Sequence, residues 1–311
     1  MAVLEVSGYT GTSGWGRGED AAEQARNCCA ELEAGAIFFF PSVPFELPES
    51  DRSSLLARKQ SGLRYHKNIS YRPKTGELRG FSSTAPDDTA ELTRIMQNYS
   101  RESVRFVERF LSPYIGRYSL DCASYRPIEE AGRDLSLHKR NDLLHVDAFP
   151  TRPTGGDRIL RVFTNINPLR ARSWIVGDGF DLLAPRHARE AGLERVMRRH
   201  QSLTARLWRR GGQILRMAGG GNERTAYDAF MLHFHVWLKE NEAFQRNCTK
   251  LAIDFPPGST WLVYTDYVPH AVLTGQFALE QTFIVHQQGM VTPEKAPIRI
   301  LEALQRRRLA A

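Results

Sequence analysis

The chain has 311 residues, 41% hydrophobic and 25% charged, which is typical of a soluble globular protein. No run reaches the roughly 18 apolar residues needed to cross a bilayer, and residues 1–6 lack the pattern of a secretory signal, so we expect a cytoplasmic protein. A net charge of +7 favours anionic partners without choosing among nucleic acid, lipid and acidic substrates.

The first 95 residues look irregular apart from two short elements, and we interpret them as an N-terminal extension. A strand is expected over residues 36–40, and a short helix over residues 51–60. Apolar residues then recur at helical spacing from Leu92 to Leu111, which predicts a helix with Asp87 or Asp88 as its N-cap.

Strand patterns follow in two blocks, residues 142–167 and residues 251–285, and the first contains a connecting loop at 151–157. Residues 185–247 between the blocks are expected to form a helical insertion. We find no repeat or low-complexity linker and predict a single domain over residues 1–311. Strand blocks on both sides of a helical insertion indicate an α+β fold with flanking helices and a double-stranded β-helix (jelly-roll) core, in which both blocks meet at one mouth.

The helical insertion holds most of the excess positive charge. From Arg186 to Arg216 there are nine arginines against two glutamates, and apolar residues interleave with them as in a basic amphipathic helix. Such a helix is either a solvated face or an interfacial helix on anionic lipid, where each arginine near the surface contributes about 1 kcal/mol. The arginines of the predicted polar face are Arg195, Arg198, Arg199, Arg206, Arg209 and Arg210.

The chain carries one pattern of metal ligands. His145 and Asp147 lie two residues apart in an apolar strand pattern and therefore point the same way, and His270 lies in a second apolar strand pattern. Two imidazoles and one carboxylate make a facial triad that leaves three positions of an octahedral iron open, which suits an oxygenase with a chelating co-substrate. We predict that these three residues are the metal ligands and the catalytic centre.

The remaining histidine pair and the cysteines are expected to have other roles. Side chains at i and i+2 of a helix diverge by about 200°, so His233 and His235 should pack or contact substrate rather than share an ion. The four cysteines lack the spacing of a zinc ribbon and are expected to be free thiols.

The segments from His145 to Phe163 and from Tyr264 to Gln276 resemble the Kdo hydroxylases, and the resemblance extends from about Ala36 to Phe283. These are Fe(II)/2-oxoglutarate-dependent dioxygenases that act on the 3-deoxy-D-manno-oct-2-ulosonic acid (Kdo) sugar of lipopolysaccharide inner core. The resemblance implies hydroxylation of Kdo at carbon 3, giving D-glycero-D-talo-oct-2-ulosonic acid (Ko), on Kdo-bearing lipid A precursors, with Fe(II), 2-oxoglutarate and O2. It also implies a peripheral location at the cytoplasmic face of the inner membrane, which favours the interfacial role of the basic helix.

The sequence departs from the superfamily at the expected co-substrate residue. Many members place an arginine roughly ten residues after the distal histidine, where its planar guanidinium binds the remote carboxylate of 2-oxoglutarate. Here that window holds Glu280, Gln281 and Thr282. We predict that Arg161, on the strand pattern from Arg158 to Asn165, binds this carboxylate instead.

The anionic groups of a Kdo-bearing substrate require further cations at the mouth of the site. Arg152 is best placed, because it follows the His145–Asp147 segment directly. Weaker candidates, which are ordinary surface charges in the alternative interpretation, are Arg126, Arg140, Arg72 and Lys67.

Two other functions are compatible with the sequence. The first is a 2-oxoglutarate dioxygenase for another acidic or lipid substrate. The second is a non-catalytic basic scaffold or nucleic-acid-binding protein, but the chain has no helix-turn-helix, zinc-finger or RNP-type signature, so we expect no nucleic-acid partner.

Overall fold

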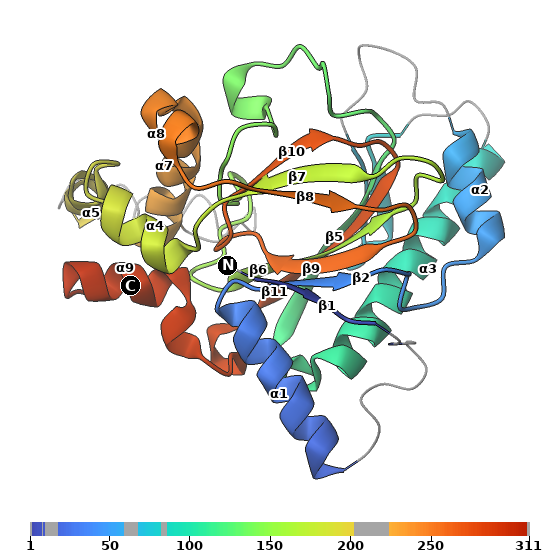
Figure 1. Cartoon of the computed structure of the whole chain (residues 1–311), viewed down its shortest axis with the longest axis horizontal. Coiled ribbons are helices and arrows are strands. Elements are labelled where there is room, and N and C mark those ends of the chain that lie inside the picture. The colour runs from blue at the N-terminus through green and yellow to red at the C-terminus, as the bar shows by residue number, and fades with distance from the viewer. Residues whose placement is uncertain are drawn as a thin grey trace.

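The computed structural model describes residues 2–7, 9, 18–58, 68–81, 86–201 and 224–309. Within them, α-helices surround two β-sheets (Figure 1). The α-helices are α1 (Glu19–Glu33), α2 (Glu49–Ala57), α3 (Pro86–Phe110), α4 (Phe180–His187), α5 (Leu193–Gln201), α7 (Ala226–Glu240), α8 (Glu242–Asn247) and α9 (Pro297–Gln305). Short 3-10 helices cover Ser112–Tyr114, Leu137–Lys139, Gln287–Gly289 and Pro293–Lys295.

The strands form one large and one small sheet. They are β1 (Val3–Glu5), β2 (Ile37–Phe40), β3 (Ile69–Arg72), β4 (Glu77–Arg79), β5 (Tyr118–Arg126), β6 (Arg158–Asn165), β7 (Arg172–Val176), β8 (Leu251–Phe255), β9 (Thr260–Tyr264), β10 (His270–Thr274) and β11 (Ala278–Val285). The large sheet has the order β1-β2-β9-β6-β11-β5-β3-β4, and the small sheet has the order β10-β7-β8. The β1–β2 pair is parallel and the other pairs are antiparallel.

The two sheets enclose an aromatic core. Phe163 of β6 and Trp261 of β9 come from the large sheet, and their rings stack at 5.2 Å between centroids. Trp174 of the small sheet packs edge-on against both, at 4.9 Å and 5.5 Å. Every residue of β9 is buried, as expected for a central strand that is covered on both faces.

Helices cover the outside of the large sheet and one end of the molecule. A second core cluster joins Leu55 of α2 and Tyr99 of α3 to Tyr125 of β5, so these helices cover the face away from the small sheet. Figure 1 shows α4, α5, α7, α8 and α9 gathered at the other end of the fold. Among the residues that the structure describes, no helix is long and apolar enough to cross a membrane.

The interpretation of the first 95 residues as an extension is wrong. The predicted strand is β2 and the predicted short helix is α2, but β1 to β4 belong to the large sheet. The missed helix α1 is also tied to the far end of the chain, because the buried Glu33 carboxylate accepts hydrogen bonds from Tyr114 and from the backbone N–H groups of Val291 and Thr292. These residues therefore form part of the main core.

The other predicted elements are found with shifted limits. The long helix begins at Pro86, so Asp87 and Asp88 lie in its first turn instead of capping it. In the first strand block only β6 is a strand, and His145 forms an isolated bridge with His270. The second block contains β8 to β11, and the predicted insertion contains the C-terminal end of α4 together with α5, α7 and α8. Arg206, Arg209 and Arg210 lie outside the described residues.

Candidate metal centre

Backbone hydrogen bonds bring the two ligand segments together. His145 and His270 each donate an N–H to the carbonyl of the other, at 3.2 Å and 3.0 Å, and Asp147 donates its N–H to the Thr265 carbonyl at 2.8 Å. Val146 is fully buried in the core between its two neighbours. The local chain therefore alternates as a strand does, and both ligand side chains of this segment turn to the same side although it is too short to be a strand.

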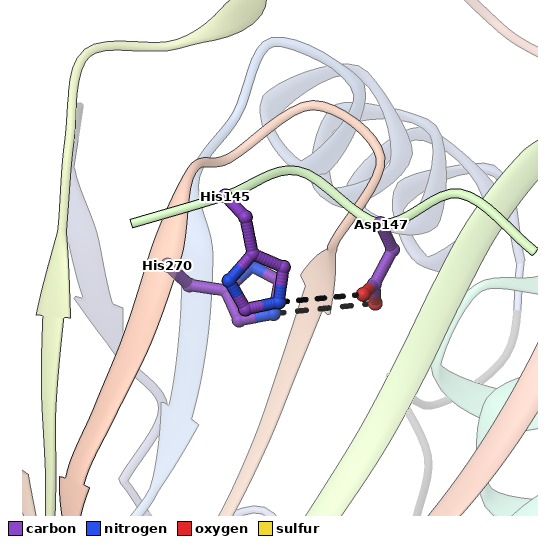
Figure 2. A group of neighbouring side chains, drawn as sticks. All are labelled: His145, Asp147 and His270. Carbon is purple, nitrogen blue, oxygen red and sulfur yellow. Dashed lines mark ion pairs between the residues drawn. The ribbon is translucent and has the colours of Figure 1, made fainter. Parts of the chain in front are cut away.

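The three predicted ligands form a compact group in the structure (Figure 2). Nε2 of His145 lies 3.9 Å from Oδ1 of Asp147, and Nε2 of His270 lies 4.0 Å from Oδ2. The Nδ1 atoms of His145 and His270 lie 2.7 Å and 3.0 Å from the carbonyl oxygens of Leu143 and Val268. Each Nδ1 therefore carries the proton and donates it, and each Nε2 keeps its lone pair for a metal ion.

The charge state of the group fits a divalent cation. Burial lowers the pKa of both His145 and His270, so both imidazoles are neutral. Burial favours the protonated form of Asp147, but the guanidinium of Arg161 holds the pKa of this carboxyl well below the usual range. Oδ2 of Asp147 is buried and lies 3.1 Å from Nη2 of Arg161, so the carboxylate is ionised, as a metal ligand must be.

Neighbouring rings fix the orientation of the ligand histidines. Trp174 stacks on His270 with 5.2 Å between centroids and 20° between planes, and His235 packs edge-on against His145 at 4.8 Å. Nδ1 of His235 lies 2.7 Å from the carbonyl of Val146. His233 and His235 are outside the ligand group, as predicted from their helical spacing.

The ligands line a cavity of about 1060 Å³. One wall comes from the two sheets and includes Phe163 and Trp174, and another comes from α7. The segment between β5 and Leu144, which we call the mouth segment (residues 127–144), lies above β10 in Figure 1 and contributes a third part of the lining. Its cavity-lining residues are Ile128, Arg133, Asp134, Leu135, His138, Lys139 and Asn141.

The sheet wall holds a network of buried ion pairs. Arg161 places one Nη 3.1 Å from Asp147 Oδ2 and the other 3.1 Å from Glu280 Oε1. Arg126 pairs with Glu280 and lies 3.8 Å from Glu130, which also receives Arg172 at 3.3 Å. Burial favours protonation of Glu280, but Arg126 and Arg161 hold its pKa below the usual value. The three arginines of this network are matched by three carboxylates, so its charges balance, and the excess positive charge of the cavity comes from other lining residues such as Lys139 and Lys239.

The predicted anion-binding residues are found in different places. Arg161 and Arg126 line the cavity, and Arg126 is bound to Glu280. Arg152 pairs with Asp121 and stacks on the ring of Phe149 at 4.4 Å, beside the cavity rather than in its lining. Arg140 pairs with Asp142 at 2.7 Å and is also absent from the lining. Arg72 is likewise absent from the lining, and Lys67 lies outside the described residues.

Several cavity residues were missed by sequence reasoning, namely Lys239, Arg133, Arg172 and Trp174. Arg172 and Trp174 belong to β7, a short strand that the pattern did not reveal. Lys239 follows His235 by four residues on α7, and this spacing places both side chains on one helix face. That spacing was the one available signal for Lys239.

Comparisons with known proteins agree with this geometry. Residues 16–308 match the family model described as 3-deoxy-D-manno-oct-2-ulosonic acid (Kdo) hydroxylase. No curated protein matches the chain.

Solved structures of the Kdo hydroxylase KdoO are similar over almost the whole chain. KdoO with alphaketoglutarate and Fe(III) is 32% identical with a TM-score of 0.82, and the match covers 99% of this chain and 97% of KdoO. KdoO with cobalt(II) is 33% identical with a TM-score of 0.83 and the same coverage. The apo structure is 32% identical with a TM-score of 0.80, and the match covers 100% of this chain and 98% of KdoO. The chain therefore belongs to the Kdo hydroxylase family, and the similar KdoO is a non-heme Fe(II) alphaketoglutarate-dependent dioxygenase.

Proposed function

We propose that this protein is an Fe(II)- and 2-oxoglutarate-dependent dioxygenase that hydroxylates Kdo at carbon 3, giving Ko, on Kdo-bearing lipid A of the lipopolysaccharide inner core. The observation that carries the proposal is the His145, Asp147 and His270 group, which lines a basic cavity in a chain of this family. Fe(II) bound there supplies the activation of O2 that is coupled to decarboxylation of 2-oxoglutarate. The protein's part is to hold the ion, orient both substrates and exclude water.

Arg161 is the residue that we assign to the remote carboxylate of 2-oxoglutarate. It lines the cavity next to Asp147, and its Nε–H donates to no acceptor among the described residues. Glu280 occupies the window where other members of the superfamily carry an arginine, and here it holds Nη1 of Arg161 at 3.1 Å. Glu280 therefore positions the guanidinium that replaces the missing arginine.

The sugar is expected to enter past the mouth segment. Phe149, Phe163 and Trp174 give the cavity an apolar side that excludes water from the reacting carbon. Arg152 and Arg140 lie beside the cavity, so we assign them to anionic groups of the substrate that remain outside it, and Arg126 to the support of Glu280 and the inner wall.

We infer that the two facing sheets form a double-stranded β-helix within a single domain. We also infer a peripheral location at the cytoplasmic face of the inner membrane. Arg195, Arg198 and Arg199 are exposed on α5, next to the part of the predicted basic helix that lies beyond the described residues. These guanidinium groups can bind an anionic lipid surface.

An anaerobic titration with Fe(II) and 2-oxoglutarate tests the proposed function. The intact protein should develop the weak visible charge-transfer band of a keto acid chelated to iron, and His145→Ala should not. Kdo-lipid A should then gain one oxygen atom by mass spectrometry when O2 is admitted. A band without this product would indicate another acidic or lipid substrate, and no band would leave the non-catalytic scaffold.

A further inference from the structure

Lys239 carries a buried charge without a carboxylate partner. Its side chain lines the cavity, and the residue is 4% exposed. Nζ donates to the His138 carbonyl at 3.1 Å, and no carboxylate of the described residues lies within ion-pair distance. An ammonium group taken out of water costs free energy unless an anion accompanies it. The Lys239 ammonium is thus a buried cation that no carboxylate of the described residues neutralises.

Lys239 belongs to a different wall from Arg161. It lies on α7, one turn after His235, which packs against the ligand His145. Arg161 lies on β6 and contacts Asp147. The cavity therefore offers two cationic positions near the ligands, one on each wall.

The chemistry of the sugar requires such a second cation. In a 3-deoxy-oct-2-ulosonic acid the carboxyl carbon is C1 and the deoxy carbon is C3, and both are bonded to C2. When C3 is presented to the metal centre, the carboxylate must lie in the immediate surroundings of the ligands. The phosphates of lipid A belong to other sugars and are farther from C3. The carboxylate is therefore the substrate anion that must be neutralised close to the ligand histidines.

We propose that Lys239 binds the carboxylate of the sugar substrate, between α7 and residues 137–141 of the mouth segment, and thereby sets which carbon faces the metal centre. This inference rests on the proposed function. It makes Lys239 a substrate-binding residue that determines specificity for an acidic sugar. The alternative role is structural, in which the hydrogen bond from Lys239 to His138 merely fastens the mouth segment to α7.

A comparison of two substrates separates these roles. The variants are Lys239→Met, Lys239→Arg and the control Lys74→Met, which removes an exposed lysine of the β3–β4 turn. The substrates are Kdo-lipid A and the same molecule with its Kdo carboxylate converted to a carboxamide. Steady-state KM is measured for every combination of protein and substrate. Equilibrium binding to the anaerobic Fe(II)–2-oxoglutarate protein is followed by tryptophan fluorescence, since Trp174 lines the cavity.

We expect Lys239→Met to raise KM and Kd for Kdo-lipid A by about 10- to 100-fold, as for loss of a hydrogen-bonded charge partner. Lys239→Arg should retain much of the affinity, and Lys74→Met all of it. With the carboxamide, wild type and Lys239→Met should bind equally weakly. KM for 2-oxoglutarate and the charge-transfer band should be unchanged, which excludes damage to the metal centre.

Two results would overturn the inference. An equal loss on both substrates would show that Lys239 acts through the mouth segment, and an effect that vanishes with dephosphorylated Kdo-lipid A would assign Lys239 to a phosphate. Failure of the wild type itself to bind or oxidise Kdo-lipid A would instead refute the proposed function. Because the band reports iron and co-substrate independently of the sugar, the two failures are distinguishable.

Discussion

His145 and His270 are held in the same local way, each with its Nδ1 against the carbonyl of the residue two positions earlier. This contact lies within a few atoms of chain, so each ligand brings its own orienting acceptor. Residue type and spacing were therefore sufficient to predict that His145, Asp147 and His270 come together as a group that could hold a metal ion. Lys239 could not be predicted in this way, because only the docking of α7 on the cavity gives its side chain a role.

Arg161→Met tests the assignment of the co-substrate residue. The variant removes the guanidinium that we place on the remote carboxylate, so KM for 2-oxoglutarate should rise by about 10- to 100-fold. KM for Kdo-lipid A should change much less. Steady-state kinetics with each substrate varied in turn gives both values.

Arg152→Met is the matched control for Arg161→Met, because it removes an arginine that lies beside the cavity. It should leave KM for 2-oxoglutarate unchanged. A similar rise in both variants would refute the assignment to Arg161.

Lys239→Met should also stabilise the folded protein near neutral pH. Burial lowers the pKa of Lys239 from 10.5 to about 8, so the folded state disfavours the ammonium form. The cost is fully present below pH 8 and falls as the pH rises towards 10.5, above which both states are neutral. Methionine should therefore add about 1–3 kcal/mol to the free energy of unfolding at pH 7 and little at pH 10.5. Urea denaturation at the two pH values measures this, and a loss of stability at pH 7 would contradict it.

At the scale of elements, sequence patterns found β6 and β8 to β11 but missed β5 and β7. β9 is a continuous apolar or β-branched run, and β11 has such residues at both ends. β5 and β7 carry Arg126 and Arg172 toward the cavity, and these charges interrupt the apolar pattern. β6 was found although it carries Arg161 toward the cavity, because apolar residues flank this arginine on both sides.

The helix α1 illustrates a second limit of local patterns. Its attachment depends on Glu33, whose carboxylate accepts from the Tyr114 hydroxyl at 2.8 Å and from Val291 and Thr292 at 2.9 Å and 2.5 Å. A glutamate near a helix end gives no sign from sequence alone that it will be fully buried against the other end of the chain.

Glu33→Ala should destabilise the protein strongly, because it leaves buried backbone donors without an acceptor. We expect a loss of about 3–5 kcal/mol in the free energy of unfolding. Glu31→Ala, two residues earlier on an exposed position of the same helix, should change it by less than about 0.5 kcal/mol. Urea denaturation compares the two, and equal effects would show that the Glu33 contacts contribute nothing.

At the scale of the whole molecule, the net charge of +7 is divided between the interior and the surface. In the cavity the arginines of the sheet wall are paired with carboxylates, and part of the excess lies on other lining residues such as Lys239. Another part lies on α5, where Glu194 is 3.6 Å from Arg198. The amino-acid composition predicted that the protein prefers anionic partners. How the positive charge is distributed between the cavity and the surface could be seen only from the fold.

The exposed arginines of α5 test the membrane proposal. Replacing Arg195, Arg198 and Arg199 with glutamine should weaken binding to vesicles that contain anionic lipid, at about 1 kcal/mol for each charge. The loss should be smaller at high salt, where screening already weakens the wild type. Vesicle co-sedimentation measures the bound fraction. The matched control replaces the three exposed tail arginines Arg306, Arg307 and Arg308, and equal losses would mean that only total charge matters.

The reciprocal backbone bridge between His145 and His270 also sets when the ion can be captured during folding. The ligand segments lie far apart in the chain, so we expect them to meet late in folding, when β6, β9 and β11 have paired. We therefore expect a metal ion to bind after the sheets have formed. It then stabilises the folded state without nucleating folding. Saturating metal should slow unfolding and leave the refolding rate almost unchanged in stopped-flow measurements, because its contacts are absent from the transition state.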